Sequence, residues 1–494
     1  MLSSRLTDYF CEQNNINLNK AYNIEKINAN QLITKDRIDL IAKLKYIEHK
    51  EKGYDLTFIK ELYTAHIEAF SHGTFIEPGN DDKNSIEKYF ETFDFLIDSI
   101  KNHGFDTTIS IIPVGSNNAI MDGAHRVAIA AYFNLEVPII RFENIFARYD
   151  TSFFQDRLLD QKYLDYLVAE YCKIKKDLYV ACVWSKALDN CQLDEVEEMI
   201  NSVCKVVYMK RVKLSYRGLN NLIIQIYSAE DWIGCIENDF SGEQRKTNAY
   251  GDKEFLTVYV LECDSHAEIL KLKQNIRDSI GIGKHAIHIT DTYDEVIRTT
   301  NLLLNQNSIN FLNTGRPTCN IQFNRNLNQF KNKLINRKLS LDDFVIDLSG
   351  TLTLYGLGHA QEVNFLTISN QYEIIDSDYV KDHQKCIEQY KTTVDNLILN
   401  PDHYFVYNDF KFLKLSFFRK ANNKKKNFLY IKLIGIKAKE NNRTIHFFNR
   451  VENKVKRKIR NAKNRIKIKI IKVTRKHVIY KSLRNLYHFF RRIE

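Results

Sequence analysis

A five-residue stretch in the first third of the chain combines residue types suited to binding and transferring phosphate. Residues 122–126 read Asp-Gly-Ala-His-Arg and lead directly into an apolar run with helical spacing. Gly123 permits the sharp turn that a change from strand to helix needs. His125 and Arg126 fall in the first helical turn, where free backbone N–H groups and the helix dipole favour an anion. In the alternative interpretation, Asp122 only pairs with Arg126 and caps the helix.

Further polar side chains occur upstream, in the run TAHIEAFSHGTFIEPG that covers residues 64–79. This run contains His66, Glu68, His72 and Glu77. Glu77 stands just before a Pro-Gly turn and could deprotonate an attacking hydroxyl as a general base. The alternative is an ordinary solvated glutamate, which is the commoner situation for this residue type.

The elements around the turn resemble the ParB/sulfiredoxin-like fold. Between Ser85 and Glu143 we expect a helix, the strand TTISIIPV, the strand NAIMD, the helix that the turn opens, and the strand VPIIRFE. Members of this superfamily bind a nucleotide phosphate through a Gly-x-His-Arg or Gly-x-x-Arg turn. The resemblance therefore implies that a nucleotide binds at Gly123, Ala124, His125 and Arg126.

The residues of the turn select among the known branches of that superfamily. Sulfiredoxin chemistry needs a cysteine where this chain has Ala124, and a partition protein needs a DNA-reading helix-turn-helix that we do not find downstream. The branch of free-serine kinases fits best. It implies ATP or CTP with Mg²⁺ as cofactors, His125 orienting or protonating the transferred group, and Asp122 or Glu77 as metal ligand or base.

A second resemblance covers Asp347–Leu366, which read DLSGTLTLYGLGHAQEVNFL and are similar to the nucleotidyltransferase superfamily. The resemblance implies nucleotide contacts at Ser349 and Gly350. Two aspartates of the family motif, which hold Mg²⁺, are replaced here by Glu362 and Asn364. Asn364 offers only a neutral oxygen, so metal binding should be weakened. We therefore expect the fold to be kept with reduced or absent catalysis.

The segment GKHAIHITDTYDEV, residues 283–296, places His288 and Asp291 near the end of an expected strand, where polar groups often face a ligand. The region resembles an α/β segment that precedes nucleotidyltransferase-like domains, often encoded among bacterial surface-polysaccharide genes. In the alternative interpretation, Asp291 and Thr292 cap the following helix.

The chain of 494 residues is too long for one core, and its 44% hydrophobic content indicates that most of it folds. The pattern of expected elements predicts an α+β and α/β multidomain protein. Its parts are a helical segment (1–60), a ParB/sulfiredoxin-like domain (61–150), a connecting helix (151–180), an α/β domain (181–313), a nucleotidyltransferase-like mixed domain (314–449) and a basic amphipathic helical tail (450–494).

The net charge of +11 is concentrated in the tail, where 17 Lys and Arg face two acids. Apolar residues recur there three or four apart, which is typical of a basic amphipathic helix. Such a helix suits an anionic membrane surface, with nucleic acid as the less favoured partner. Without a long apolar span or a signal peptide, we expect a cytoplasmic protein, peripheral on the inner face of the membrane.

Together these features predict a nucleotide-dependent phosphotransferase or nucleotidyltransferase-like protein of bacterial surface-polysaccharide biosynthesis, acting on a small-molecule or sugar hydroxyl. Two other classes stay open. The chain could be a non-catalytic nucleotide-binding scaffold or sensor at the membrane. It could also be a ParB-like protein that binds nucleic acid.

Overall fold

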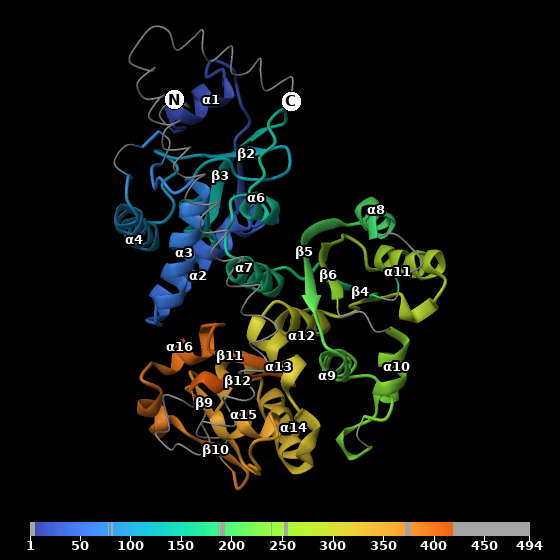
Figure 1. Ribbon diagram of the computed structural model, residues 1–494. Coiled ribbons are helices and arrows are strands. Elements are labelled where there is room, and N and C mark those ends of the chain that lie inside the picture. Colours follow the sequence, from blue (N-terminus) through green and yellow to red (C-terminus); the bar gives the residue numbers. More distant parts are fainter. Residues whose placement is uncertain are drawn as a thin grey trace.

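The computed structural model describes residues 5–417, except 78, 81–82, 186, 188–192, 239, 251–254 and 371–376. This part of the chain is a mixture of helices and three separate sheets, as expected for an α+β multidomain protein (Figure 1). In the same part, no helix has both the length and the apolar character to cross a membrane. The predicted tail, 450–494, lies outside the described residues.

The N-terminal unit has a three-stranded sheet in the order β1-β3-β2. Strands β2 and β3 are parallel, with helix α5 in the connection between them, while β1 is antiparallel to β3. The elements are α1 (Asp8–Asn14), β1 (Glu25–Asn28), α2 (Asp39–Lys52), α3 (Thr57–Phe70), α4 (Ile86–His103), β2 (Ile112–Gly115), α5 (Ala124–Tyr132) and β3 (Glu136–Phe142).

Two expectations for this unit are wrong. Residues 1–60 are not wholly helical, because β1 joins the sheet through β3, more than a hundred residues later. Its sequence, EKIN, is only partly buried and has no alternation of apolar residues that would predict a strand. The expected strand NAIMD is reduced to an isolated bridge between Ile120 and Val114.

The middle unit contains a four-stranded sheet in the order β5-β6-β4-β7, in which every neighbouring pair is antiparallel. Strands and helices alternate as expected, but as two interleaved β-α-β units rather than as a parallel sheet. The elements are α6 (Thr151–Asp156), α7 (Gln161–Ile174), β4 (Leu178–Val183), α8 (Leu193–Val203), β5 (Lys205–Lys213), α9 (Tyr216–Ile226), α10 (Glu243–Tyr250), β6 (Phe255–Glu262), α11 (His266–Ile280), β7 (Ile287–Ile289) and α12 (Tyr293–Leu303).

Strand β4 shows why this sheet is buried on both faces. Ala181 and Val183 point to one side, where they belong to the core formed with α8 and α11. Val180 and Cys182 point to the other side, where they join the large core shared with α7 and α12. Because side chains alternate along a strand, one face of the sheet packs on α8 and α11 and the other packs on α7 and α12.

The C-terminal unit has a mixed five-stranded sheet in the order β10-β9-β8-β12-β11. Helix α13 connects it with the middle unit, because the Leu312 carbonyl accepts from Asn221 of α9 at 2.7 Å and the Ser308 hydroxyl accepts from Val406 N of β11 at 2.9 Å. The elements are α13 (Gln306–Thr314), α14 (Ile321–Asn336), β8 (Phe344–Ile346), α15 (Leu348–Leu354), β9 (Val363–Thr367), β10 (Val380–Asp382), α16 (Val394–Leu399), β11 (Tyr404–Tyr407) and β12 (Phe410–Leu413).

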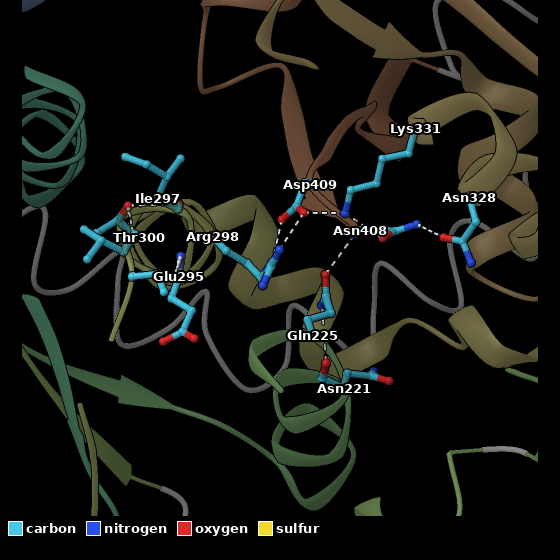
Figure 2. Close-up of polar contacts among 12 residues, drawn as sticks. Asn221, Gln225, Glu295, Ile297, Arg298, Thr300, Asn328, Lys331, Asn408 and Asp409 are labelled. Carbon is cyan, nitrogen blue, oxygen red and sulfur yellow. Dashed lines mark hydrogen bonds and ion pairs between the residues drawn. The ribbon is translucent and has the colours of Figure 1, made fainter. Parts of the chain in front are cut away.

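The turn between β11 and β12 forms a polar contact between the middle and C-terminal units (Figure 2). Asn408 and Asp409 have φ of 50° and 65°, as a two-residue hairpin turn of this kind requires. The Asp409 carboxylate accepts from Arg298 Nε and Nη2 at 2.8 and 3.0 Å and from Lys331 Nζ at 2.5 Å. Burial alone would raise the pKa of Asp409, but Arg298 and Lys331 hold this pKa below its ordinary value.

Replacing Asp409 should therefore weaken the junction of the units. In Asp409→Asn, Arg298 and Lys331 lose their shared carboxylate, so we expect the free energy of unfolding in urea to fall by about 2–3 kcal/mol. The control Glu237→Gln breaks the exposed pair with Arg325 and should leave the free energy of unfolding nearly unchanged, because exposed ion pairs contribute little. Equal losses in the two variants would contradict this role of Asp409.

Candidate functional site

The predicted turn is where α5 begins, and its geometry requires glycine. Gly123 is the N-cap of α5 and has φ of 81°, in the left-handed region. A Cβ at this position would lie 2.7 Å from Ile112 Cδ1 and 3.0 Å from Arg126 Nη2. Ala124 opens the helix, and the following residues Val127–Ala131 are buried against the N-terminal core.

Asp122 and Arg126 are held beside the turn by several polar contacts. Asp122 accepts from its neighbour Gly123 N at 2.6 Å and from the Thr7 hydroxyl at 3.1 Å. Arg126 lies 3.9 Å from Asp122 Oδ2 and donates to the Ser110 hydroxyl. The alternative interpretation is thus half right, because the ion pair forms but no side chain caps α5.

His125 points into a partly buried polar and aromatic environment. Its Nε2 shares a 2.7 Å hydrogen bond with the Tyr63 hydroxyl, and the Phe93 ring meets it edge-on at 4.7 Å between centroids. Removal from water lowers the pKa of His125 well below its ordinary value, and the charges of Lys43 and Lys83 lower it further. Both effects favour the neutral imidazole of His125 and make it a weak base, suited to form hydrogen bonds rather than to take up a proton.

A buried charge network that the sequence did not reveal lies beside His125. Arg37 donates to both carboxylate oxygens of Asp39 at 2.9 Å, and Lys43 Nζ lies 2.7 Å from Asp39 Oδ2 and 3.1 Å from His66 Nε2. Arg37 also donates to the Ile120 carbonyl, just before the turn. The one available signal was an Asp and a Lys four residues apart inside an apolar helical run.

Glu77 belongs to the same neighbourhood and is not simply solvated. Its carboxylate lies 2.7 Å from Lys83 Nζ, which stands over the Tyr89 ring at 5.5 Å from the centroid. Burial raises the pKa of Tyr63 well above its ordinary value, and the charge of Glu77 adds to this effect. The structure thus brings Glu77 and His125 together around Tyr63, whereas Asp122 bonds with Thr7.

The second predicted site, in the C-terminal unit, forms a compact polar cluster. Asp347 is the N-cap of α15, and its Oδ1 accepts from Ser349 N at 2.9 Å and from Ser349 Oγ at 2.5 Å. Asn364 Nδ2 donates to Ser349 Oγ at 3.2 Å. His383, which the sequence did not single out, places Nδ1 2.8 Å from Asp347 Oδ2.

Two other predicted residues of this unit are less engaged. Gly350 is a packing position, because a Cβ there would meet Ile346 Cγ2 at 2.6 Å and Phe323 Cζ at 3.0 Å. Glu362 precedes β9, and its charge acts on His383 by raising the pKa of that residue. Within the described ranges of the chain, no group of three or more His, Cys, Asp and Glu side chains is placed to hold a metal ion.

His288 and Asp291, the predicted site residues of the middle unit, contact different partners. His288 is buried against Tyr227, edge-on at 5.0 Å between ring centroids, and burial lowers its pKa to about 3. Asp291 receives both of its 2.9 Å contacts from Lys273 Nζ. Thr292 caps α12, as the alternative interpretation expected, but Asp291 does not. The structure does not bring His288 and Asp291 together with the turn at Gly123.

Comparisons of the chain with protein-family models and with curated proteins found no match. The three resemblances and the sites they imply therefore depend on the residues and contacts described above. Among the candidate sites, the surroundings of His125 bring together the buried titratable groups Asp39, Lys43, His66 and Tyr63.

The conformation of Gly123 leads to a stability prediction. Gly123→Ala should lower the free energy of unfolding by more than the roughly 1–2 kcal/mol that a left-handed φ alone costs, because the new Cβ also meets Ile112. Gly53→Ala is the matched control, since Gly53 has φ of 68° and nothing within 4 Å of an added Cβ. An effect no larger at Gly123 than at Gly53 would show that the close approach is unimportant.

The pair between Asp347 and His383 should be visible in a pH titration. The hydrogen bond with Asp347 raises the pKa of His383 above 6.5, against the opposing effect of burial. The pair therefore stabilises the fold fully below the ordinary histidine pKa and loses this contribution as the pH rises through the folded value. In Asp347→Asn, NMR of the ring protons should show a lower pKa for His383 than in the natural protein. An unchanged pKa would contradict the assignment.

Proposed function

We propose that this chain is a nucleotide-dependent phosphotransferase that binds the nucleotide phosphates at the first turn of α5. The observation that supports this most is that His125, next to Arg126 in the first turn of α5, feels the charges of the buried cations Lys43 and Lys83 and shares a hydrogen bond with Tyr63. We further propose a small-molecule or sugar hydroxyl as the acceptor, in bacterial surface-polysaccharide biosynthesis.

The charges around the turn are consistent with an anionic ligand. Burial lowers the pKa of Lys43, against the opposing influence of Asp39, so its ammonium group would gain from a nearby negative charge. Arg126 has a side chain that is 26% exposed and can donate to phosphate while it keeps its contact with Ser110. Backbone N–H groups at the start of α5 add donors aimed at the same anion.

His125 and the nearby carboxylates would divide the remaining roles. Tyr63 fixes the His125 ring, and the neutral imidazole would orient the transferred group through a hydrogen bond. Glu77 would be the base that accepts the proton of the attacking hydroxyl. Asp122, whose side chain is 31% exposed, would hold Mg²⁺, which when bound neutralises charge on the transferred phosphoryl group.

The C-terminal unit would support this reaction without catalysing one of its own. Asn364 supplies no negative charge and uses its amide nitrogen on Ser349, while His383 lies against one oxygen of Asp347. The first feature lowers the negative charge available to a divalent cation, and the second occupies one oxygen of Asp347. We propose that the tail, 450–494, attaches the protein to an anionic membrane surface.

A thermal-shift screen with ATP, CTP, GTP and UTP in the presence of Mg²⁺ tests the proposal. At least one nucleotide should stabilise the protein in a saturable way, and Arg126→Ala should weaken its apparent affinity by about tenfold or more, because a charge-assisted contact is lost. His125→Ala should mainly lower turnover, measured as nucleoside diphosphate formed with L-serine or a sugar as acceptor.

Matched controls separate this role from general damage to the protein. Arg148→Ala removes another arginine of the N-terminal unit, which pairs with Asp150 at 3.1 Å, and His103→Ala removes an exposed histidine at the end of α4. Both should behave as the natural protein. Binding without turnover would favour a nucleotide sensor, and no stabilisation by any of the four nucleotides would reject the proposal.

A further inference from the structure

A cavity of about 400 Å³ lies where the three units meet, and none of the features discussed so far uses it. Its wall is formed by α2 and the end of α5 from the N-terminal unit, by α7, and by the C-terminal unit through residues 342–343, Leu399, Tyr404 and Lys411. Figure 1 shows α7 on the side of the middle unit that faces the N-terminal unit, near the C-terminal unit. The volume is within the range of small-molecule sites.

The cavity wall carries a chain of alternating charges. Lys45 contacts Glu48 at 2.6 Å and Glu170 at 3.1 Å, and Lys173 contacts Glu170 at 3.1 Å and Asp342 at 3.0 Å. The chain ends at Lys411, 3.4 Å from Asp342. Its six members are Glu48, Lys45, Glu170, Lys173, Asp342 and Lys411, three acids and three bases.

These ion pairs favour the charged forms of the acids, whereas burial lowers the pKa of Lys411 against the opposing charge of Asp342. The pKa of Asp342 is lowered by the charges of Lys173 and Lys411. Burial opposes the charge of Glu170, but Lys173 and Lys45 still lower its pKa. The wall also carries Asp343 and His49, and burial favours the neutral form of both, because it raises the pKa of Asp343 and lowers that of His49. The cavity is therefore strongly polar, and the six charges of the chain balance one another.

Several of these groups remain open to a molecule in the cavity. The Asp342, Glu48 and Lys173 side chains are 40%, 28% and 26% exposed, in spite of their ion pairs. Tyr166 and Tyr404 add aromatic surface to the same wall, with Lys411 Nζ 5.1 Å from the centroid of the Tyr404 ring. Hydrogen-bond donors, acceptors and apolar faces thus line one space.

We propose that this cavity binds a neutral polyhydroxylated molecule of the size of a monosaccharide. Hydroxyl groups can donate to Glu48 and Asp342 and accept from Lys173 at the same time. A charged ligand would be repelled by as many of these six groups as would attract it. The aromatic rings offer flat apolar surfaces for the C–H face of a sugar ring.

The cavity is distinct from the turn at Gly123, although the same helices reach both. Helix α5 begins at the turn, and Ala131 and Tyr132 at its other end line the cavity. Nine residues of helix span roughly 13 Å. On α2, Lys43 faces His66 while Lys45 belongs to the cavity wall. Sugar binding in the cavity is therefore a separate proposal, and its test does not depend on nucleotide binding at the turn.

The test compares three sugars that share one ring but differ in charge: D-glucose, D-glucuronate and D-glucosamine. D-galactose and N-acetyl-D-glucosamine extend the neutral set. Isothermal titration with the full chain should detect saturable binding of at least one neutral sugar, with glucuronate and glucosamine at least about tenfold weaker than glucose if glucose is the sugar bound. Stronger binding of a charged sugar, or no binding of any neutral sugar, overturns the proposal.

Variants locate the binding in the cavity. Ala131→Leu fills the space without touching a charge, and Tyr404→Phe removes one hydroxyl while keeping the ring. The first should abolish sugar binding and the second should weaken it severalfold. Circular dichroism checks the folding of both, and Tyr404→Phe remains informative if Ala131→Leu does not fold. Tyr22→Phe, next to Phe142 and outside the cavity wall, is the control. Unchanged binding in both cavity variants also overturns the proposal.

Discussion

The buried carboxylate of Asp39 is the contact on which the N-terminal unit depends. Only 1% of its side chain is exposed, and it accepts from both Arg37 and Lys43. Burial would raise the pKa of Asp39, but the two cations lower it well below its ordinary value. Arg37 extends the contact to the Ile120 carbonyl, and Lys43 extends it to His66. The segment before the turn and the helices that enclose His125 are therefore positioned by one ionised group, whose loss would leave two buried cations unpaired.

Carboxylates shared by two cations also occur between the units, where they connect separate elements. Asp409 joins α12 and α14 through Arg298 and Lys331, and Asp342 joins α7 and β12 through Lys173 and Lys411. Contacts of this kind specify relative position, because a charge buried without its partner is costly. Apolar packing alone, as in the core around β4, constrains position less strictly.

Local features of the sequence predicted much of the secondary structure. Helix α4 begins after Ser85, whose hydroxyl caps it, and β3 coincides with the apolar run VPIIRFE that was expected as a strand. The turn at Gly123 also lies where the glycine predicted it. These elements follow from residues within a few positions of one another, and this is the range over which capping and periodicity act.

What the sequence could not reveal depends on contacts between distant segments. Strand β1 has no pattern of its own and exists because β3 offers it hydrogen bonds. His383 lies against Asp347 because β10 pairs with β9 in parallel, which no spacing in the sequence indicates. The roles of Lys43 and Asp39 were equally hidden, since a charged pair on a helix is usually a solvated one. Tertiary structure decides which of these pairs is buried.

The interleaved strand order of the middle sheet determines when this sheet can form during synthesis. Strand β4 pairs with β6 on one side and β7 on the other. During synthesis, β4 is therefore made before its two partner strands, which end at Glu262 and Ile289. The N-terminal sheet, by contrast, has all its strands once Phe142 has been made. During synthesis, the unit that carries His125 can therefore close first, while the apolar faces of β4 stay without their sheet until more than a hundred further residues have left the ribosome.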